Sequence, residues 1–133
     1  PGGHTIKRKR LETIMNDNSI RLTERSLIVE PLGLNKLWSF TRQIQVPWEH
    51  VRGATHDSGV KYEGKGWRGP GLRMGQKLAG TFHADGERQF WNVNGYENAV
   101  VIELANERFS RLIVSVDDPA ECAHRISSRA RAE

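Results

Sequence analysis

The first stretch of the chain that could carry chemistry is Gly64-Lys-Gly-Trp-Arg-Gly69, which satisfies the pattern G-x-G-x-x-G. In dinucleotide-binding proteins these glycines open a helix, and the N-terminus of that helix meets the pyrophosphate. Here Pro70 and Gly71 follow at once, so that no helix can begin properly. The Gly-Lys-Ser/Thr ending of a P-loop is missing as well. We therefore expect neither a nucleotide site nor any other cofactor.

The same glycines belong to a basic segment, residues 61–77, which is the strongest candidate for a binding surface. It holds five cations and a single acid, Glu63, with Trp67 among them. Backbone amides freed by glycine, cations and a loop tryptophan together suit an anionic ligand or a lipid headgroup. The alternative is a solvated barrel loop whose glycines serve only to bend the chain. The candidate binding residues are Lys61, Lys65, Trp67, Arg68, Arg73 and Lys77.

The remaining reactive side chains form no recognisable catalytic or metal-binding motif. His50, His56, His83 and His124 lie on separate predicted elements, and no pair has the spacing of a zinc motif. Cys122 is the one cysteine, which excludes an internal disulfide and suits a reducing compartment. Because Cys122 falls on the apolar stripe of a predicted C-terminal helix, we expect it to be a small buried apolar residue and not a nucleophile. We predict no catalytic residue and no metal site, and an enzyme with a pocket in its barrel is the third functional hypothesis.

The basic character of the chain belongs to its first residues. The net charge is +4 and the calculated pI is about 9.6, and residues 7–10, Lys-Arg-Lys-Arg, account for the whole excess. The remainder is balanced, so we do not expect nucleic acid as a partner. We assign residues 1–18 to a basic, flexible N-terminal tail and residues 19–133 to one domain. Because the chain opens on Pro1 without a methionine, part of the tail is expected to come from processing or a tag, and Met15 is a candidate start.

No segment predicts a membrane span or a signal peptide. The most apolar stretches are strand-sized, far below the roughly 18 residues that cross a bilayer. The cations near the start are followed by no apolar region. We therefore expect a cytoplasmic protein, with any membrane contact at the inner face of the membrane.

Period-two alternation predicts strands in the first half of the domain. Ile20 and Leu22 alternate with polar neighbours, and so do Ile44 and Val46. A later strand is expected to be broken at Gly53. Two hairpins follow, one about a turn at Asp-Gly, which supplies the positive φ angles of a tight primed turn, and one joining residues 99–104 to 109–116. Short strands with turns this frequent indicate a barrel or sandwich.

The last segment changes to a helical period. Asp118, Pro119 and Glu121 supply an N-cap, a proline at the first helical position and an acid at the third. After an all-β chain, such a helix is expected to cover an open mouth of the barrel. Small apolar residues then fall on one helical stripe, namely Cys122, Ala123, Ile126 and Ala130.

Several of these stretches resemble a bacterial pleckstrin-homology (PH)-like domain family. The resemblance rests on Val46-Pro-Trp-Glu-His-Val, on the Gly-rich stretch leading into Gly80-Thr-Phe and on Val101-Ile-Glu-Leu. Its most specific element is Leu112-Ile-Val-Ser-Val-Asp-Asp-Pro-Ala-Glu, a final strand that passes through Asp-Pro into a helix. It spans residues 19–129 and implies an all-β fold, a strongly bent antiparallel barrel or sandwich of about seven strands capped by the C-terminal helix.

The resemblance implies a non-catalytic interaction module, because similar domains bind partners and some bacterial relatives oligomerise. The leading prediction is therefore binding of a protein partner, or of a second copy in a homo-oligomer, through a sheet edge. The alternative is peripheral binding of anionic lipid or another polyanion through residues 61–77. The chain departs from similar bacterial proteins in having no membrane-spanning segment. It also lacks alternating cations along the first hairpin, so phosphoinositide recognition is not expected.

Overall fold

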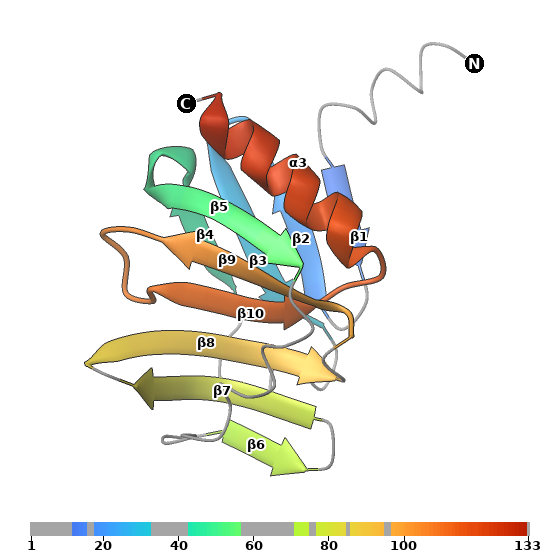
Figure 1. Cartoon of the computed structure of the whole chain (residues 1–133). Coiled ribbons are helices and arrows are strands. Elements are labelled where there is room, and N and C mark those ends of the chain that lie inside the picture. The colour runs from blue at the N-terminus through green and yellow to red at the C-terminus, as the bar shows by residue number, and fades with distance from the viewer. Residues whose placement is uncertain are drawn as a thin grey trace.

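The computed structural model describes residues 12–15, 18–32, 43–56, 71–74, 77–84, 86–94 and 97–132. Within these residues the chain forms two β-sheets and one C-terminal helix, α3 (Pro119–Arg131), as Figure 1 shows. The predicted fold class, all-β with one C-terminal helix, is confirmed. No helix in the described part of the chain is long and apolar enough to cross a membrane.

The first sheet is a four-stranded antiparallel meander. Its alternation follows the predicted pattern, because Ile20, Leu27 and Val46 are fully buried while Arg21 and Ile28 on the other face are partly exposed. Its strands, in spatial order, are β1 (Glu12–Met15), β2 (Asn18–Leu22), β3 (Ser26–Pro31) and β4 (Ile44–Pro47).

Strand β1 lies inside the segment that the sequence analysis assigned to a flexible tail. It pairs antiparallel with β2, from Glu12 opposite Leu22 to Met15 opposite Ser19. These four residues, and Asn18 at the start of β2, are therefore strand residues and not part of a flexible tail. A strand this short contains too few alternations to produce a clear period-two signal.

The second sheet has six strands, and both predicted hairpins belong to it. β7 and β8 pair from Lys77–Asn94 to Ala84–Glu87, and Gly86 in their turn has a φ of 77°, as a tight primed turn requires. β9 and β10 form the other hairpin. In spatial order the strands are β5 (Val51–His56), β9 (Ala99–Leu104), β10 (Arg111–Ser115), β8 (Glu87–Asn94), β7 (Lys77–Ala84) and β6 (Gly71–Met74).

One strand pair departs from the antiparallel arrangement that was predicted. β10 runs parallel to β8, with Arg111 beside Gln89 and Val114 beside Asn92. β10 therefore lies between β8 and β9, although β8 and β9 are consecutive in the chain. Alternation of apolar residues does not encode the direction of a neighbouring strand, so the sequence could not show this arrangement. The strands of the two sheets, four and six, also exceed the seven that the resemblance implied.

Helix α3 begins as its capping residues predict. The Asp118 side chain accepts a hydrogen bond from the backbone N–H of Glu121 at 3.3 Å, and Pro119 occupies the first turn. The predicted stripe faces the core, where Cys122, Ala123 and Ile126 are buried. α3 packs mainly on β5 and β9 and lies alongside β5 in Figure 1.

The contribution of the Asp118 N-cap to the free energy of unfolding can be measured. Replacing Asp118 with alanine leaves the N–H of Glu121 without its acceptor, and we expect the free energy of unfolding to fall by about 1 kcal/mol. Urea denaturation followed by circular dichroism would measure this change. Asp118→Asn retains the acceptor and should stay within about 0.5 kcal/mol of the wild type; equal losses in both variants would show that the cap does not stabilise the helix.

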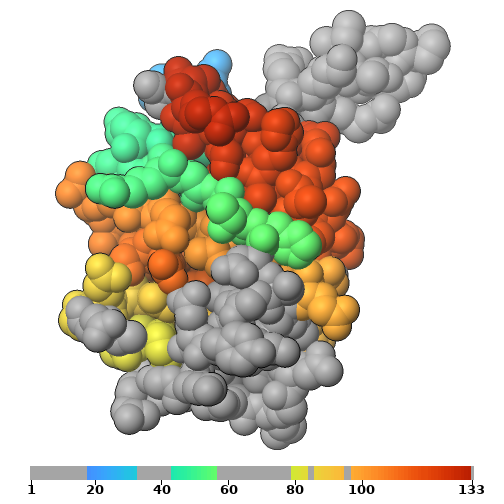
Figure 2. Space-filling model, viewed as in Figure 1, coloured from blue at the N-terminus to red at the C-terminus, as the bar shows by residue number. Residues whose placement is uncertain are grey.

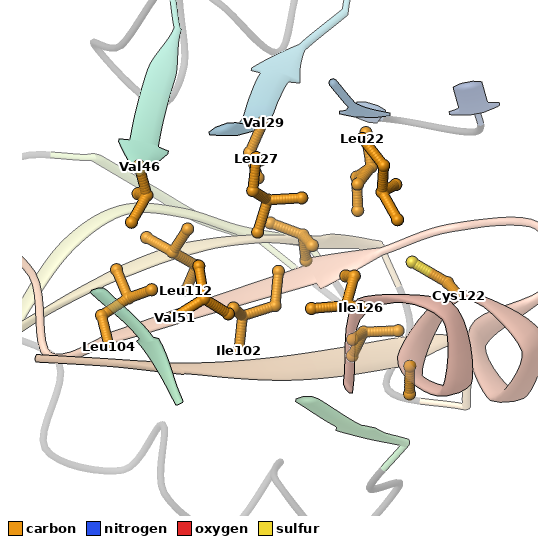
Figure 3. Packing of buried hydrophobic residues seen from close by; sticks show 14 of the residues in the cluster. Leu22, Leu27, Val29, Val46, Val51, Ile102, Leu104, Leu112, Cys122 and Ile126 are labelled. Carbon is orange, nitrogen blue, oxygen red and sulfur yellow. The ribbon is translucent and has the colours of Figure 1, made fainter. Parts of the chain in front are cut away.

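The main core lies between the two sheets and α3. Figure 3 shows Leu27 and Val46 of the four-stranded sheet directed toward Ile102 and Leu112 of the six-stranded sheet, with Ile126 of the helix beside them. The thiol of Cys122 is part of this core, and burial, reinforced by the nearby charge of Asp118, raises its pKa to about 12. That thiol is therefore protonated at neutral pH, in keeping with a packing role.

A smaller apolar cluster lies on the other face of the six-stranded sheet. It includes Phe82 and Trp91, whose rings meet edge to face with centroids 5.8 Å apart. Trp48 belongs to the main core, so Trp48 and Trp91 are both buried packing residues. Trp38 and Trp67 lie outside the described residues. Both faces of the six-stranded sheet thus carry buried side chains.

A buried polar network joins the two sheets. The side-chain amide of Asn18, in β2, donates to the carbonyl oxygens of Asn92 (3.1 Å) and Ser115 (2.9 Å). The side-chain oxygen of Asn18 accepts a hydrogen bond from the side-chain amide of Asn92 at 2.8 Å. Both asparagine residues are fully buried, so these bonds satisfy groups that water cannot reach. The network fixes β2 against the parallel pair β8–β10.

Candidate functional site

The structure describes two of the six predicted binding residues. Lys61, Lys65, Trp67 and Arg68 lie outside the described residues. Arg73 lies in β6 and Lys77 in β7, at the end where these two strands join. Arg73 is paired with Leu78, whereas Lys77 is paired with Met74.

This register bears on the polyanion hypothesis. Neighbouring positions in a strand alternate between faces, so the positions of Arg73 and Lys77 belong to opposite faces of the β6–β7 hairpin. A polyanion surface needs its cations on one side. The two positions that the structure describes therefore give no support to that arrangement, and binding through residues 61–77 stays a prediction.

A different surface, at the edge strand β4, offers a better-defined candidate site. Among the described strands β4 has one neighbour, β3. Gln45 and Pro47 lie on its outer face, because Val46 between them faces the core. A shallow, mostly apolar cleft of about 390 Å³ opens here. We call it the β4 cleft; it is lined by Arg25, Ser26, Gln45 and Pro47.

Local hydrogen bonds hold the walls of the β4 cleft. The Gln45 side chain donates to the Ser26 hydroxyl at 3.2 Å, across the β3–β4 pair. The backbone N–H of Ser26 donates to the Thr23 hydroxyl (3.0 Å), and the N–H of Thr23 donates to the Ser26 carbonyl (2.9 Å). The turn between β2 and β3 is therefore closed by Thr23 and Ser26, and the cleft is built on rigid elements.

The C-terminal helix also supports this turn, through Trp48. The indole N–H of Trp48 donates to the Thr23 carbonyl at 2.9 Å, and its backbone N–H donates to the Arg25 carbonyl at 3.2 Å. The Arg129 guanidinium lies over the indole ring, 5.4 Å from its centroid, and also donates to the Glu24 carbonyl. Core, turn and helix thus meet behind the β4 cleft.

The edge strand β5 of the six-stranded sheet is bonded to helix α3. The Ser127 hydroxyl of α3 donates to the Ala54 carbonyl (2.9 Å) and accepts from the Ala54 N–H (3.0 Å). Figure 2 shows β5 and α3 forming one continuous surface. β5 runs without interruption from Val51 to His56, so the predicted break at Gly53 is wrong; the strand instead shows a register shift between Val51 and Gly53. The helix therefore occupies backbone groups of β5 that could otherwise pair with another chain.

Two of the described histidines, His50 and His56, connect elements of the fold. His50 Nδ1 lies 2.5 Å from Glu107 Oε2, and this pair ties the short 3-10 helix η1 (Trp48–His50) to the β9–β10 loop. His56 Nε2 lies 2.7 Å from the Glu97 carbonyl oxygen. Among the described residues no group of three or more His, Cys, Asp or Glu side chains could hold a metal ion.

The sequence predicts no binding site at β4, although it contains one signal for an edge strand there. A proline at the end of a short strand, as at Pro47, favours an edge position because it cannot donate to a neighbouring strand. The partner residues from the β2–β3 turn have no such signature. Comparison with known proteins adds no candidate, because the chain matches no protein-family model, no curated protein and no solved structure.

Proposed function

We propose that this domain is a non-catalytic interaction module that binds an extended segment of a protein partner along β4. The observation that carries the proposal is the mostly apolar β4 cleft, which opens on the outer face of an edge strand. In strand addition, main-chain hydrogen bonds supply affinity and pockets for alternate side chains supply specificity. The edge of β4 would supply the main-chain hydrogen bonds, and the β4 cleft would supply a pocket for one side chain.

The geometry sets the chemistry of the partner segment. Its outward-facing residues follow Gln45 and Pro47 in register, so one of them would lie beside Pro47, and a long side chain there would reach across it into the β4 cleft. A mostly apolar cleft favours an aliphatic or aromatic side chain at that position. The residues on either side of it would alternate to the opposite face, near the end of the main core. The proposed ligand is therefore an extended peptide with apolar residues at alternate positions.

A display library of random twelve-residue peptides would test this proposal directly. We expect the selected peptides to share alternate apolar residues and to adopt no helix on binding. Gln45→Lys places a charge at the cleft and should weaken binding at least tenfold in fluorescence polarisation, since an edge lysine opposes strand pairing. Gln43→Lys, the same change two residues earlier at an exposed position before β4, should leave the affinity unchanged.

Two results would contradict the proposal. One is the absence of any peptide enriched over an unrelated β-protein, and the other is equal affinity of the selected peptides for wild type and Gln45→Lys. N-methylation of every second residue of a selected peptide blocks the N–H groups on one side of its strand. It should abolish binding when these groups face β4, and it should leave binding intact when they face away. If a second copy of the chain supplies the strand instead, sedimentation velocity will show a concentration-dependent dimer that Gln45→Lys abolishes.

A further inference from the structure

A second cleft lies at one end of the six-stranded sheet and shares no lining residue with the β4 cleft. The β7–β8 turn and the β9–β10 loop meet at this end, as Figure 1 shows. The space between them measures about 410 Å³, within the usual range for small-molecule sites. We call it the arginine cleft; it is lined by His83, Gly86, Glu87, Arg88, Glu107, Arg108 and Ser110.

The parallel pair β8–β10 is the reason that these residues meet. Parallel strands begin at the same end of a sheet, so the residues at the start of β8 lie beside those preceding β10. The backbone N–H of Ser110 donates to the Arg88 carbonyl at 2.8 Å, which closes this end. A Cβ atom built on Gly86 would meet nothing within 4 Å, so the turn borders open space.

Both carboxylates in the arginine cleft already accept hydrogen bonds from the protein. Glu87 Oε1 accepts from the Ser110 hydroxyl at 3.2 Å. Glu107 Oε2 lies 2.5 Å from His50 Nδ1. Each of these contacts ties one loop to a neighbouring element. Glu87 and Glu107 therefore help to hold the walls of the cleft together.

The two arginines are placed differently. Neither Arg88 nor Arg108 makes an ion pair with any carboxylate that the structure describes, and both are exposed. The Arg108 guanidinium lies 4.7 Å from the ring centroid of Phe109. That ring is buried and packs on Phe90 at a centroid distance of 5.8 Å, so the guanidinium rests on a fixed surface. The cleft thus presents two guanidinium groups, one of them positioned by stacking.

We infer that the arginine cleft binds the phosphate group of a small molecule. A guanidinium is a planar fork of donors that matches pairs of oxygen atoms. A carboxylate offers one pair of oxygens for a bidentate contact, whereas the terminal oxygens of a phosphate monoester let two forks bind different pairs of oxygen atoms on the same group. His83 and the Ser110 hydroxyl line the same space and can add hydrogen bonds. The inference does not depend on peptide binding at β4.

Titration with inorganic phosphate, followed by amide chemical shifts at constant ionic strength, would test this site. We expect saturable shifts that are largest at Gly86 and Ser110. Arg88→Gln and Arg108→Gln should each weaken binding about tenfold, equivalent to about 1.4 kcal/mol. Arg88→Lys retains the charge without the fork and should still lose affinity. Arg131→Gln, at an exposed position in the last turn of α3, is the matched control and should bind as the wild type does.

Titrations with glycerol phosphate and with acetate decide whether the ligand group is a phosphate or a carboxylate. Glycerol phosphate should bind at least as tightly as inorganic phosphate, which would support a phosphate monoester as the ligand. Acetate should bind several-fold more weakly. Acetate binding equal to phosphate, equal affinity of the arginine variants and wild type, or shifts that do not saturate would each overturn the inference.

Discussion

Replacing Asn18 with leucine is expected to lower the free energy of unfolding by about 4 kcal/mol, because it removes three hydrogen bonds made by a fully buried side chain. These bonds join Asn18 to the side-chain amide of Asn92 and to the backbone carbonyl oxygens of Asn92 and Ser115. Leucine is close to asparagine in size, so the loss arises from hydrogen bonding rather than from a cavity. Urea denaturation followed by circular dichroism would measure it through the midpoint at constant slope.

A double-mutant cycle separates this effect from simple repacking. Asn92→Leu removes the partner amide, and the double variant should lose less stability than the sum of the single losses, by at least about 1 kcal/mol. Asn94→Ala changes an exposed side chain near the end of the same strand and should remain within about 0.5 kcal/mol of wild type. A loss below about 1 kcal/mol for Asn18→Leu would show that water reaches the network in the native state.

Truncating Ile126 to alanine is the second change with a large expected effect, a loss of about 3 kcal/mol. Ile126 is fully buried where the helix stripe enters the main core, beside residues of both sheets (Figure 3). The substitution leaves a cavity that a helix held on β5 and β9 can fill only in part. Thermal and urea denaturation should agree on the loss.

Hydrogen exchange would show whether the same substitution loosens the helix. Ser127 follows Ile126 and bonds both backbone groups of Ala54, so a shifted helix should reduce the protection of the Ala54 amide. Ser128→Ala, at an exposed position of α3, should preserve both stability and protection. Unchanged protection together with a stability loss under 1.5 kcal/mol would mean that the helix is not an essential part of the core.

The parts of the fold that the sequence predicts well are governed by local rules. The helix start at Asp118 and the turn at Gly86 follow from capping and turn chemistry that acts over a few residues. Alternation in β2 and β3 likewise assigns inward and outward faces without knowledge of the partner strand. These features were predictable because their causes lie within one segment.

The remaining features depend on segments that are distant in the sequence. Asn18 bonds to residues 74 and 97 positions away, and each participant alone resembles an ordinary polar residue in a strand. His50 and Glu107 are 57 positions apart. The arginine cleft likewise forms because a parallel pair joins two strand starts, which no local pattern encodes. The predicted basic segment 61–77 follows a compositional signal, and four of its six candidate binding residues lie outside the described part of the chain.

The place of β10 between β8 and β9 has a consequence for the order in which the chain can fold. β8 and β9 run in opposite directions and are joined by residues 95–98, a length that ordinarily makes a hairpin of neighbouring strands. A hairpin closes in about 1–10 μs, whereas a ribosome adds about 5–20 residues per second. Both strands therefore leave the ribosome well before β10 and have time to pair with each other. The native sheet then requires that pairing to open, so that β10 can enter between them and β9 can close on its other side.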